Sequence, residues 1–164
     1  MERGSPDPRG RGFVLRYPPL ERLLPHRAPM ILLDEVLGDA AGSISCGVTL
    51  RADSPFVENR CVPAVVAVEY MAQCVAAYAG LQAFREDRPV RIGYLIGARL
   101  VEFSVDAFGV GEELVVQANR AWGDDVLGNF KCSIDSSGCR VVSAVLTVFQ
   151  GDIDDVPIGR AAGP

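Results

Sequence analysis

The chain has 164 residues, of which 49% are hydrophobic and 23% charged, a balance typical of one folded globular domain. Its 16 basic and 21 acidic residues give a formal net charge of −5, which argues against a nucleic-acid binder, since such proteins are usually basic. His26 is the only histidine, so any mechanism that needs two histidines in one chain is excluded.

Both ends of the chain are rich in glycine, proline and charge. Residues 1–12 and 151–164 offer little apolar surface to bury, so we expect two disordered tails around a single domain over residues 13–150. The N-terminal stretch lacks the apolar segment of a signal peptide. The cysteines are odd in number and form no CxxC pair, which predicts free thiols, no metal site and a reducing, cytoplasmic location. They are Cys46, Cys61, Cys74, Cys132 and Cys139.

The first folded elements are expected to be a stiff loop and a hairpin. A short turn over residues 20–24 precedes His26, which stands between two prolines that favour an extended backbone. Residues 30–37 form an apolar run of strand length. Residues 43–50 alternate apolar and polar side chains, as a half-buried strand does.

A long apolar helix is predicted to follow. Pro63 suits its first turn, because the missing N–H has no partner there, and the helix should extend to about Glu86. Residues 62–81 approach the length of a membrane span. Glu69 and Gln73 lie near the middle of that stretch, where polar groups are costly in lipid. We therefore expect a buried helix of a soluble protein and no membrane.

Four further strands are expected in the second half, separated by glycine, aspartate and serine turns: 90–106, 113–122, 127–135 and 139–150. The pattern predicts an α+β fold in which an antiparallel sheet of about six strands wraps round one long central helix. One sheet cannot cover every side of such a helix. We therefore expect a second copy of the chain, in a homodimer or a higher even oligomer.

Two segments resemble the hotdog-fold 3-hydroxyacyl-acyl carrier protein dehydratases, whose order of elements is the same. LPHRAPMILLDEV, residues 24–36, is similar to their LPHRxPFLLxDxV segment. VPAVVAVEYMAQ, residues 62–73, is similar to PGxxxxEAxAQ at the start of their helix, and GVGEEL, residues 109–114, to their PGDxL turn. The resemblance implies the hotdog fold and a hydro-lyase that acts on acyl thioesters.

One family motif is missing. The fatty-acid dehydratases carry a catalytic histidine in a GHFP segment before the helix, and the equivalent position here is Pro55. The sequence is more similar to a divergent branch associated with aryl-polyene pigment biosynthesis, in which the LPHxxPM histidine and the helix glutamate are the prominent polar pair. GYLIGAR, residues 93–99, resembles a GFLLGxR segment of that branch.

The candidate catalytic residues are therefore His26 and Glu69. On an apolar helix the pKa of the Glu69 carboxyl is expected to be raised by desolvation, which suits a group that donates a proton. The alternative is a structural ion pair, for example with Arg99. His26 is the obvious general base of the chain. The alternative is a loop histidine whose ring bonds a backbone carbonyl.

Substrate contacts are expected at the start of the helix and on its next turn. The N–H groups of Ala64 and Val65, after Pro63, lie at the positive end of the helix dipole and could polarise a thioester carbonyl. The alternative is an ordinary buried helix start. Gln73 joins this set through the family motif. Four arginines are candidates for the entrance of a phosphopantetheine arm, or are simply solvated: Arg51, Arg60, Arg91 and Arg99.

The main hypothesis is a dehydratase that converts a 3-hydroxyacyl thioester, carried on acyl carrier protein or CoA, to the 2-enoyl thioester in fatty-acid or polyene-type biosynthesis. His26 would take the C2 proton and Glu69 would protonate the departing hydroxyl. No cofactor is implied. Two alternatives remain: a hotdog acyl thioesterase in which Glu69 activates water, and a catalytically degenerate subunit that binds acyl chains or pairs with an active dehydratase.

Overall fold

A computed structural model of the chain describes residues 17–124 and 126–151. The predicted tails, 1–12 and 151–164, lie outside the described residues apart from Gly151, so the domain limits stay a prediction. One long helix, α1, spans Ala67–Arg85. The main strands are β1 (Glu35–Ala40), β2 (Ser43–Thr49), β4 (Gly93–Phe103), β6 (Glu113–Gly123), β7 (Leu127–Ser136) and β8 (Cys139–Gln150).

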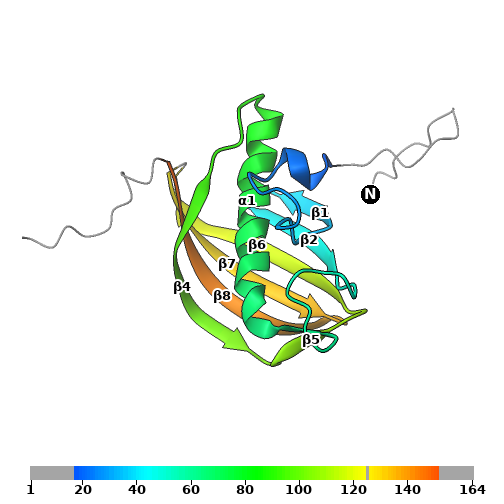
Figure 1. Cartoon of the computed structure of the whole chain (residues 1–164). Coiled ribbons are helices and arrows are strands. Elements are labelled where there is room, and N and C mark those ends of the chain that lie inside the picture. Colours follow the sequence, from blue (N-terminus) through cyan, green and yellow to red (C-terminus); the bar gives the residue numbers. More distant parts are fainter. Residues whose placement is uncertain (1–16, 125, 152–164) are drawn as a thin grey trace, which may run out of the picture.

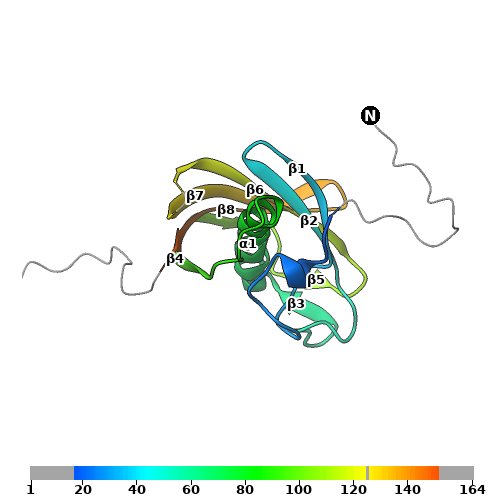
Figure 2. The same ribbon diagram turned by 90° about the horizontal axis from the view of Figure 1, so that it is seen from above.

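The six main strands form one antiparallel sheet in the order β1-β2-β6-β7-β8-β4. The sheet curves round α1, which lies across its concave face (Figures 1 and 2). Alternate residues of β2 and β6 turn inward and pack against the helix, among them Ile44, Cys46, Val116 and Ala118. The expected α+β arrangement of six strands around one helix is confirmed.

The structure differs from the sequence-based prediction at two short elements. A small second sheet pairs β3 (Cys61–Pro63) with β5 (Ala107–Gly109), where the sequence predicted loop and turn. A 3-10 turn, η2 (Ala64–Val66), precedes α1, so the helix begins four residues later than predicted. Pro63 is therefore the last residue of a strand instead of the first helical residue, because the Ala64 N–H donates to the carbonyl of Asp106 (2.9 Å).

The first strand is also shorter than predicted. Residues 30–33 belong to no strand and β1 begins at Glu35, just after Asp34, whose N–H donates to the Gly47 carbonyl of β2 (2.8 Å). The reason is a side-chain partner: the Leu32 N–H donates to Oε1 of Gln73 on the helix (2.9 Å) instead of to a neighbouring strand. The segment that follows His26 is thus attached to α1.

The apolar length of the helix is explained by its burial. Residues 64–85 are long and apolar enough to cross a membrane by composition, but 56% of their most apolar window is buried inside the protein. Tyr70, Met71 and Leu81 are among the fully covered side chains. This agrees with the expected core helix of a globular domain.

The described cysteines are all free thiols, as predicted. Cys46, Cys74 and Cys132 are buried in the core. The neighbouring Cys46 side chain and burial hold the pKa of Cys74 well above its usual range, and burial raises the pKa of Cys132 to about 12. Because the thiolate is the reactive form, these thiols act as small apolar side chains.

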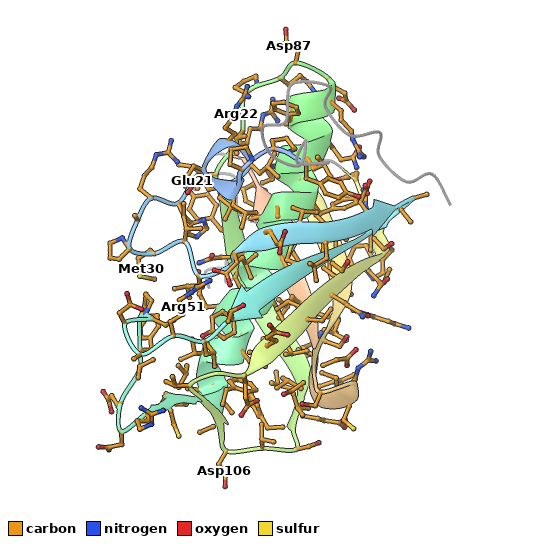
Figure 3. The ribbon with its side chains drawn as sticks, turned by 90° about the vertical axis from the view of Figure 1, so that its right-hand side faces the viewer. Glu21, Arg22, Met30, Arg51, Asp87 and Asp106 are labelled. Atoms are coloured by element: carbon orange, nitrogen blue, oxygen red, sulfur yellow. The ribbon has the colours of Figure 1, made fainter. Side chains whose placement is uncertain are left out.

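The N-terminal segment packs tightly on the C-terminal half of α1. Its 3-10 turn, η1 (Leu20–Arg22), places the Arg22 guanidinium over the ring of Phe84, 4.8 Å from its centroid. Arg22 lies beside the upper turns of α1 in Figure 3. Below it, a Cβ added at Gly80 would lie only 1.9 Å from the Leu23 carbonyl oxygen. Gly80 therefore permits the close approach that directs the chain toward His26.

We expect Gly80→Ala to lower the free energy of unfolding by about 2 kcal/mol, measured by urea denaturation. The added methyl group must push backbone away, which costs about 1–3 kcal/mol, and this exceeds the gain of up to about 1 kcal/mol in helix propensity. Gly38→Ala is the matched control, because its new Cβ would meet only Ser45 Oγ at 3.4 Å. Equal free energies of unfolding for Gly80→Ala and Gly38→Ala would contradict the close contact between Gly80 and the Leu23 carbonyl.

Candidate active site

A groove of about 530 Å³ runs along one side of α1, within the size range of small-molecule sites. Its helical wall extends from Glu69 to Ala83, about 21 Å at 1.5 Å per residue. Small side chains, Ala72, Ala76 and Ala79, make that wall shallow. Strands β4, β7 and β8 supply apolar side chains to the opposite wall, namely Leu95, Phe130, Val148 and Phe149.

His26 and Glu69 lie together in this groove. The distance from His26 Nε2 to Glu69 Oε1 is 3.6 Å within one chain, and the two side chains are 30% and 39% exposed. This separation is longer than a hydrogen bond, so both groups keep an atom that can reach a bound molecule directly or through one water. The two residues that the sequence proposed as an acid–base pair are therefore neighbours.

The loop around His26 is held by its own arginine. The Arg27 guanidinium donates to the carbonyls of Leu24 (3.1 Å), Pro25 (3.3 Å) and His26 (2.7 Å). The buried Nδ1 atom of His26 has no hydrogen-bond partner within residues 17–124 and 126–151. The alternative role, an imidazole anchored through Nδ1 to a nearby carbonyl, is therefore not what this chain shows.

Gln73 lies behind the pair and is completely buried. Its Oε1 accepts from the Leu32 N–H (2.9 Å), and its Nε2 donates to the Met30 carbonyl (2.8 Å) and to Glu69 Oε1 (2.9 Å). Both amide N–H groups are used in these contacts, and Gln73 does not line the groove. The contacts hold Glu69, and a substrate contact of Gln73 stays a prediction.

The predicted contacts at the helix start also need correction. Pro63, Ala64 and Val65 do not line the groove. The Ala64 N–H is already bonded to the Asp106 carbonyl, and the Val65 side chain is 67% exposed, on the outside of the chain. The sequence could not show this, because a short strand and a 3-10 turn replace the first helical turn. Of the two N–H groups predicted to polarise a thioester carbonyl, that of Ala64 is thus already bonded, and the role of that of Val65 stays a prediction.

Three arginines lie along the same groove: Arg88, Arg91 and Arg120. Only Arg91 was among the four that the sequence analysis singled out. Arg88 pairs with Glu86, and Arg120 donates to the Gly123 carbonyl (2.6 Å). Arg51 lies elsewhere, paired with Asp34 (2.9 Å). Arg99 is on the edge strand β4. Glu69 contacts His26 and Gln73 and does not form the ion pair with Arg99 that was considered as an alternative.

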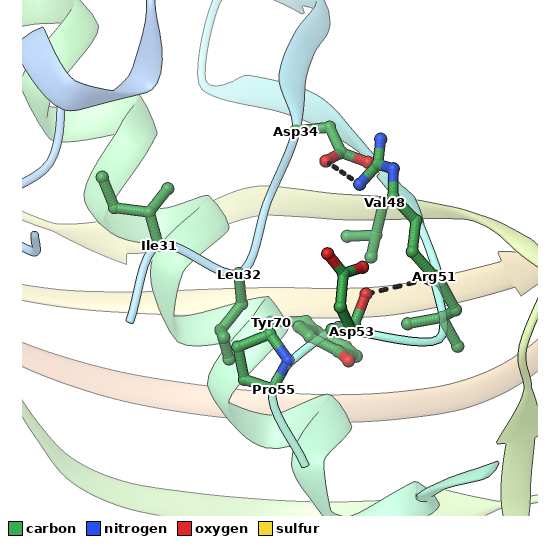
Figure 4. A pocket seen from close by; sticks show the side chains of 10 residues that line it. Ile31, Leu32, Asp34, Val48, Arg51, Asp53, Pro55 and Tyr70 are labelled. Carbon is green, nitrogen blue, oxygen red and sulfur yellow. Dashed lines mark hydrogen bonds and ion pairs between the residues drawn. The ribbon is translucent and has the colours of Figure 1, made fainter. Parts of the chain in front are cut away.

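A second, smaller pocket of about 210 Å³ shares no lining residue with the groove. Figure 4 shows Pro55 and Asp53 on either side of the Tyr70 ring, with the Arg51–Asp34 pair at the upper right. The Asp34 carboxylate raises the pKa of the Arg51 guanidinium. The position where the related dehydratases carry their loop histidine is therefore a proline in a different pocket of this chain.

Tyr70, which lines this pocket, makes the stability of the chain depend on pH. Burial, and then the nearby Asp34 carboxylate, raise its pKa to about 12 from the ordinary value of 10.0. The folded chain therefore holds the phenol proton more tightly than the unfolded chain. The resulting stability is fully present below about pH 10 and is lost as the pH rises toward about 12.

Between about pH 9 and about pH 12, the free energy of unfolding should fall by about 2 kcal/mol more in the wild type than in Tyr70→Phe. The reason is that the variant has no phenol at this position to ionise. Urea denaturation at several pH values measures this. Tyr94→Phe, on the edge strand β4, is the control for the loss of a hydroxyl. Parallel pH curves for Tyr70→Phe and the wild type would contradict the buried phenol.

Comparison with known proteins identifies the family of the chain. Residues 18–157 match the family model described as ApeP-like, ApeP dehydratase. The 3-hydroxyacyl-[acyl-carrier-protein] dehydratase FabZ of Chlamydia pneumoniae is 31% identical over 113 residues, 65% of this chain and 72% of that protein.

Solved structures show the same relationship. A chain of the dehydratase heterocomplex ApeI:P from Xenorhabdus doucetiae superimposes with a TM-score of 0.81 and 33% identity, over 85% of this chain and 95% of that one. A hypothetical thioesterase from Streptococcus pneumoniae TIGR4, solved with coenzyme A, gives a TM-score of 0.54 at 12% identity, over 71% and 84% of the two chains. That second likeness shows the fold alone.

A sheet wrapped round one helix, together with the similarity to a chain of a dehydratase complex, defines a hotdog-fold protein of the dehydratase class. The chain belongs to the ApeP-like dehydratase family. It is an enzyme of that family, and the resemblance noted from the two sequence motifs is confirmed.

Proposed function

We propose that the groove dehydrates a 3-hydroxyacyl thioester carried on acyl carrier protein, with His26 and Glu69 as the catalytic residues. The observation that supports this most directly is their 3.6 Å separation in one groove of a dehydratase-family chain. Elimination of water needs one group that accepts a proton from C2 and one that gives a proton to the C3 hydroxyl. A side-by-side pair can serve both atoms from one face of the substrate.

The reaction balances with these two residues. His26 Nε2 takes the C2 proton, the electron pair left on C2 forms the C2=C3 double bond, and the C3–O bond breaks. Glu69 gives its carboxylic proton to the departing hydroxyl, which leaves as water. The proton now on His26 then returns to Glu69, directly or through one water, and the pair is ready for the next turnover.

The rest of the groove suits an acyl thioester. Its apolar side chains, such as Phe130 and Val148, would surround the acyl chain, and Arg88, Arg91 and Arg120 would attract the phosphate of a phosphopantetheine arm or CoA. The FabZ relative is named for acyl-carrier-protein substrates, which favours the carrier protein for this chain. We propose a cytoplasmic role in lipid or polyene biosynthesis, where reducing conditions would keep the thiols free.

We also propose that the working enzyme is a homodimer joined through β4. This strand is a sheet edge, and apolar side chains on it or beside it are 41–77% exposed: Ile92, Leu95, Ile96, Leu100 and Phe103. An open apolar edge favours pairing with another strand. The orphaned Nδ1 of His26 also favours an acceptor from a second subunit, since a base that is free at Nε2 carries its proton on Nδ1.

The experiment is to mix the purified chain with a 3-hydroxyacyl thioester, on carrier protein and on CoA, and to follow enoyl absorbance and free thiol separately. Enoyl product without thiol release supports the dehydratase. Thiol release without enoyl product would instead indicate the thioesterase alternative, which rests on shared fold only.

The degenerate-subunit alternative has one specific observation in its favour, because the similar solved chain belongs to a dehydratase heterocomplex. Binding of the thioester without turnover by the chain alone, and turnover only after a second hotdog protein is added, would select it.

A further inference from the structure

The Gln73 amide contacts both halves of the proposed catalytic pair. On its own helix it bonds Glu69, one turn earlier. It also bonds the backbone of Met30 and Leu32, in the segment that follows His26. Its side chain is completely buried, so the bond to Leu32 is shielded from water and the bonds to Met30 and Glu69 are partly shielded.

The orientation of this amide is dictated by its neighbours. The Leu32 N–H is a donor and can be satisfied only by the amide oxygen. The amide nitrogen therefore faces the Met30 carbonyl and Glu69 Oε1, and each of its two hydrogens has one acceptor. A flipped amide would place a donor against the Leu32 donor and an acceptor against two acceptors.

This orientation distinguishes the two oxygens of Glu69. Oε1 accepts from Gln73 and is the oxygen nearest to His26. No described residue donates to Oε2, and the Glu69 side chain is 39% exposed in the groove. In a carboxylic acid the carbonyl oxygen is the better acceptor, so the acid proton belongs on the oxygen that the amide does not occupy.

We propose that Gln73 is the positioning residue of the catalytic pair: it fixes Oε1 of Glu69 as an acceptor and leaves Oε2 as the oxygen that gives its proton to the substrate. It also sets the distance between Glu69 and the segment that carries His26. This inference rests on the proposed function, because it assigns a proton-transfer role to Glu69.

The informative variant is Gln73→Glu, which has the same shape. When ionised, the introduced carboxyl still accepts from the Leu32 N–H but cannot donate to Met30 or to Glu69. When protonated, it regains one donor, which can serve the Met30 carbonyl or Glu69 Oε1 but not both, so the contacts of the amide are restored in part. The other titratable and charged groups in the groove are the same in both proteins: His26, Glu69, Tyr78, Glu86, Arg88, Arg91, Arg120 and Asp124.

We expect Gln73→Glu to lower kcat at least about 10-fold near neutral pH, with KM changed less than about 3-fold, because the acid is misplaced while the groove is intact. The defect should shrink as the pH falls and the introduced carboxyl becomes protonated. Gln117→Glu, on β6 outside the groove, is the control for the same change in charge. A wild-type kcat and pH profile would overturn the proposal, as would an equal loss at every pH.

A second readout does not need turnover. His26 is the only histidine, so its imidazole gives one set of NMR signals in protein without a histidine tag. Gln73→Glu and Glu69→Gln should each shift these signals, because each variant alters the contacts of the Glu69 oxygen nearest to the ring. If the wild type shows no dehydration but the signals shift in both variants, the proposed function fails while the contact between Gln73 and the pair stands. Signals that stay in place in Gln73→Glu would overturn the positioning role.

Discussion

Glu69→Gln is expected to lower the rate of dehydration at least about 100-fold, the low end of what one general acid contributes. The amide has the same shape as the carboxyl but no acidic proton to give to the leaving hydroxyl. The chain should stay folded, because the new side chain can still accept from Gln73 and is partly exposed in the groove. The rate is measured from enoyl absorbance, with the melting temperature as the check on folding.

Glu58→Gln is the matched control, because it removes one carboxylate from an exposed loop outside the groove. It should leave both the rate and the melting temperature close to those of the wild type. A folded Glu69→Gln variant with the full rate of dehydration would rule out Glu69 as the acid.

His26→Ala should cause a loss of similar size, because it removes the only imidazole of the chain. The double variant is expected to be little worse than the poorer single one, since groups that act together in one step are not additive. Losses that simply multiply would mean that the residues act in separate steps. Full activity of folded His26→Ala would leave Glu69 to work alone.

The fold was predictable because its signals are local. Alternation over residues 43–50 identified β2 together with its buried face, and the apolar run identified α1. The errors lie where a side chain or a distant backbone group competes with local pairing. The Gln73 amide takes the Leu32 N–H that a strand would use, and the Asp106 carbonyl takes the Ala64 N–H that would otherwise have been free.

The proximity of His26 and Glu69 was predictable from the sequence, and the contacts that hold them were not. His26 and Glu69 are 43 positions apart, and only the family motif joined them before the structure showed one groove. Gln73 stands in the same motif, but its role depends on the backbone at Met30 and Leu32, which periodicity cannot reveal. The contribution of Arg120 to the groove follows from the curvature of the sheet, for which the sequence carries no local signal.

The second large effect is expected at the open edge of the sheet. Ile96→Lys combined with Leu100→Lys should raise the dissociation constant of the dimer at least about 100-fold. In the isolated chain these side chains are 41% and 77% exposed on β4, and a dimer joined through this strand would bury them. Each lysine would remove apolar contact and leave an unpaired charge in the interface. A loss of about 1.4 kcal/mol of association free energy for each substitution is enough for a 100-fold rise in the dissociation constant.

The control is Leu37→Lys, which adds one charge at a 45% exposed leucine on β1, the opposite edge of the same sheet. Light scattering at micromolar concentration should find the wild type and the control as dimers and the double-lysine variant as a folded monomer. If the second subunit completes the surroundings of His26, that monomer should lose most of its dehydration activity while its melting transition remains cooperative. A wild-type chain that is a stable monomer would contradict the β4 interface, and restored association on addition of a second hotdog protein would show that the natural partner is a different chain.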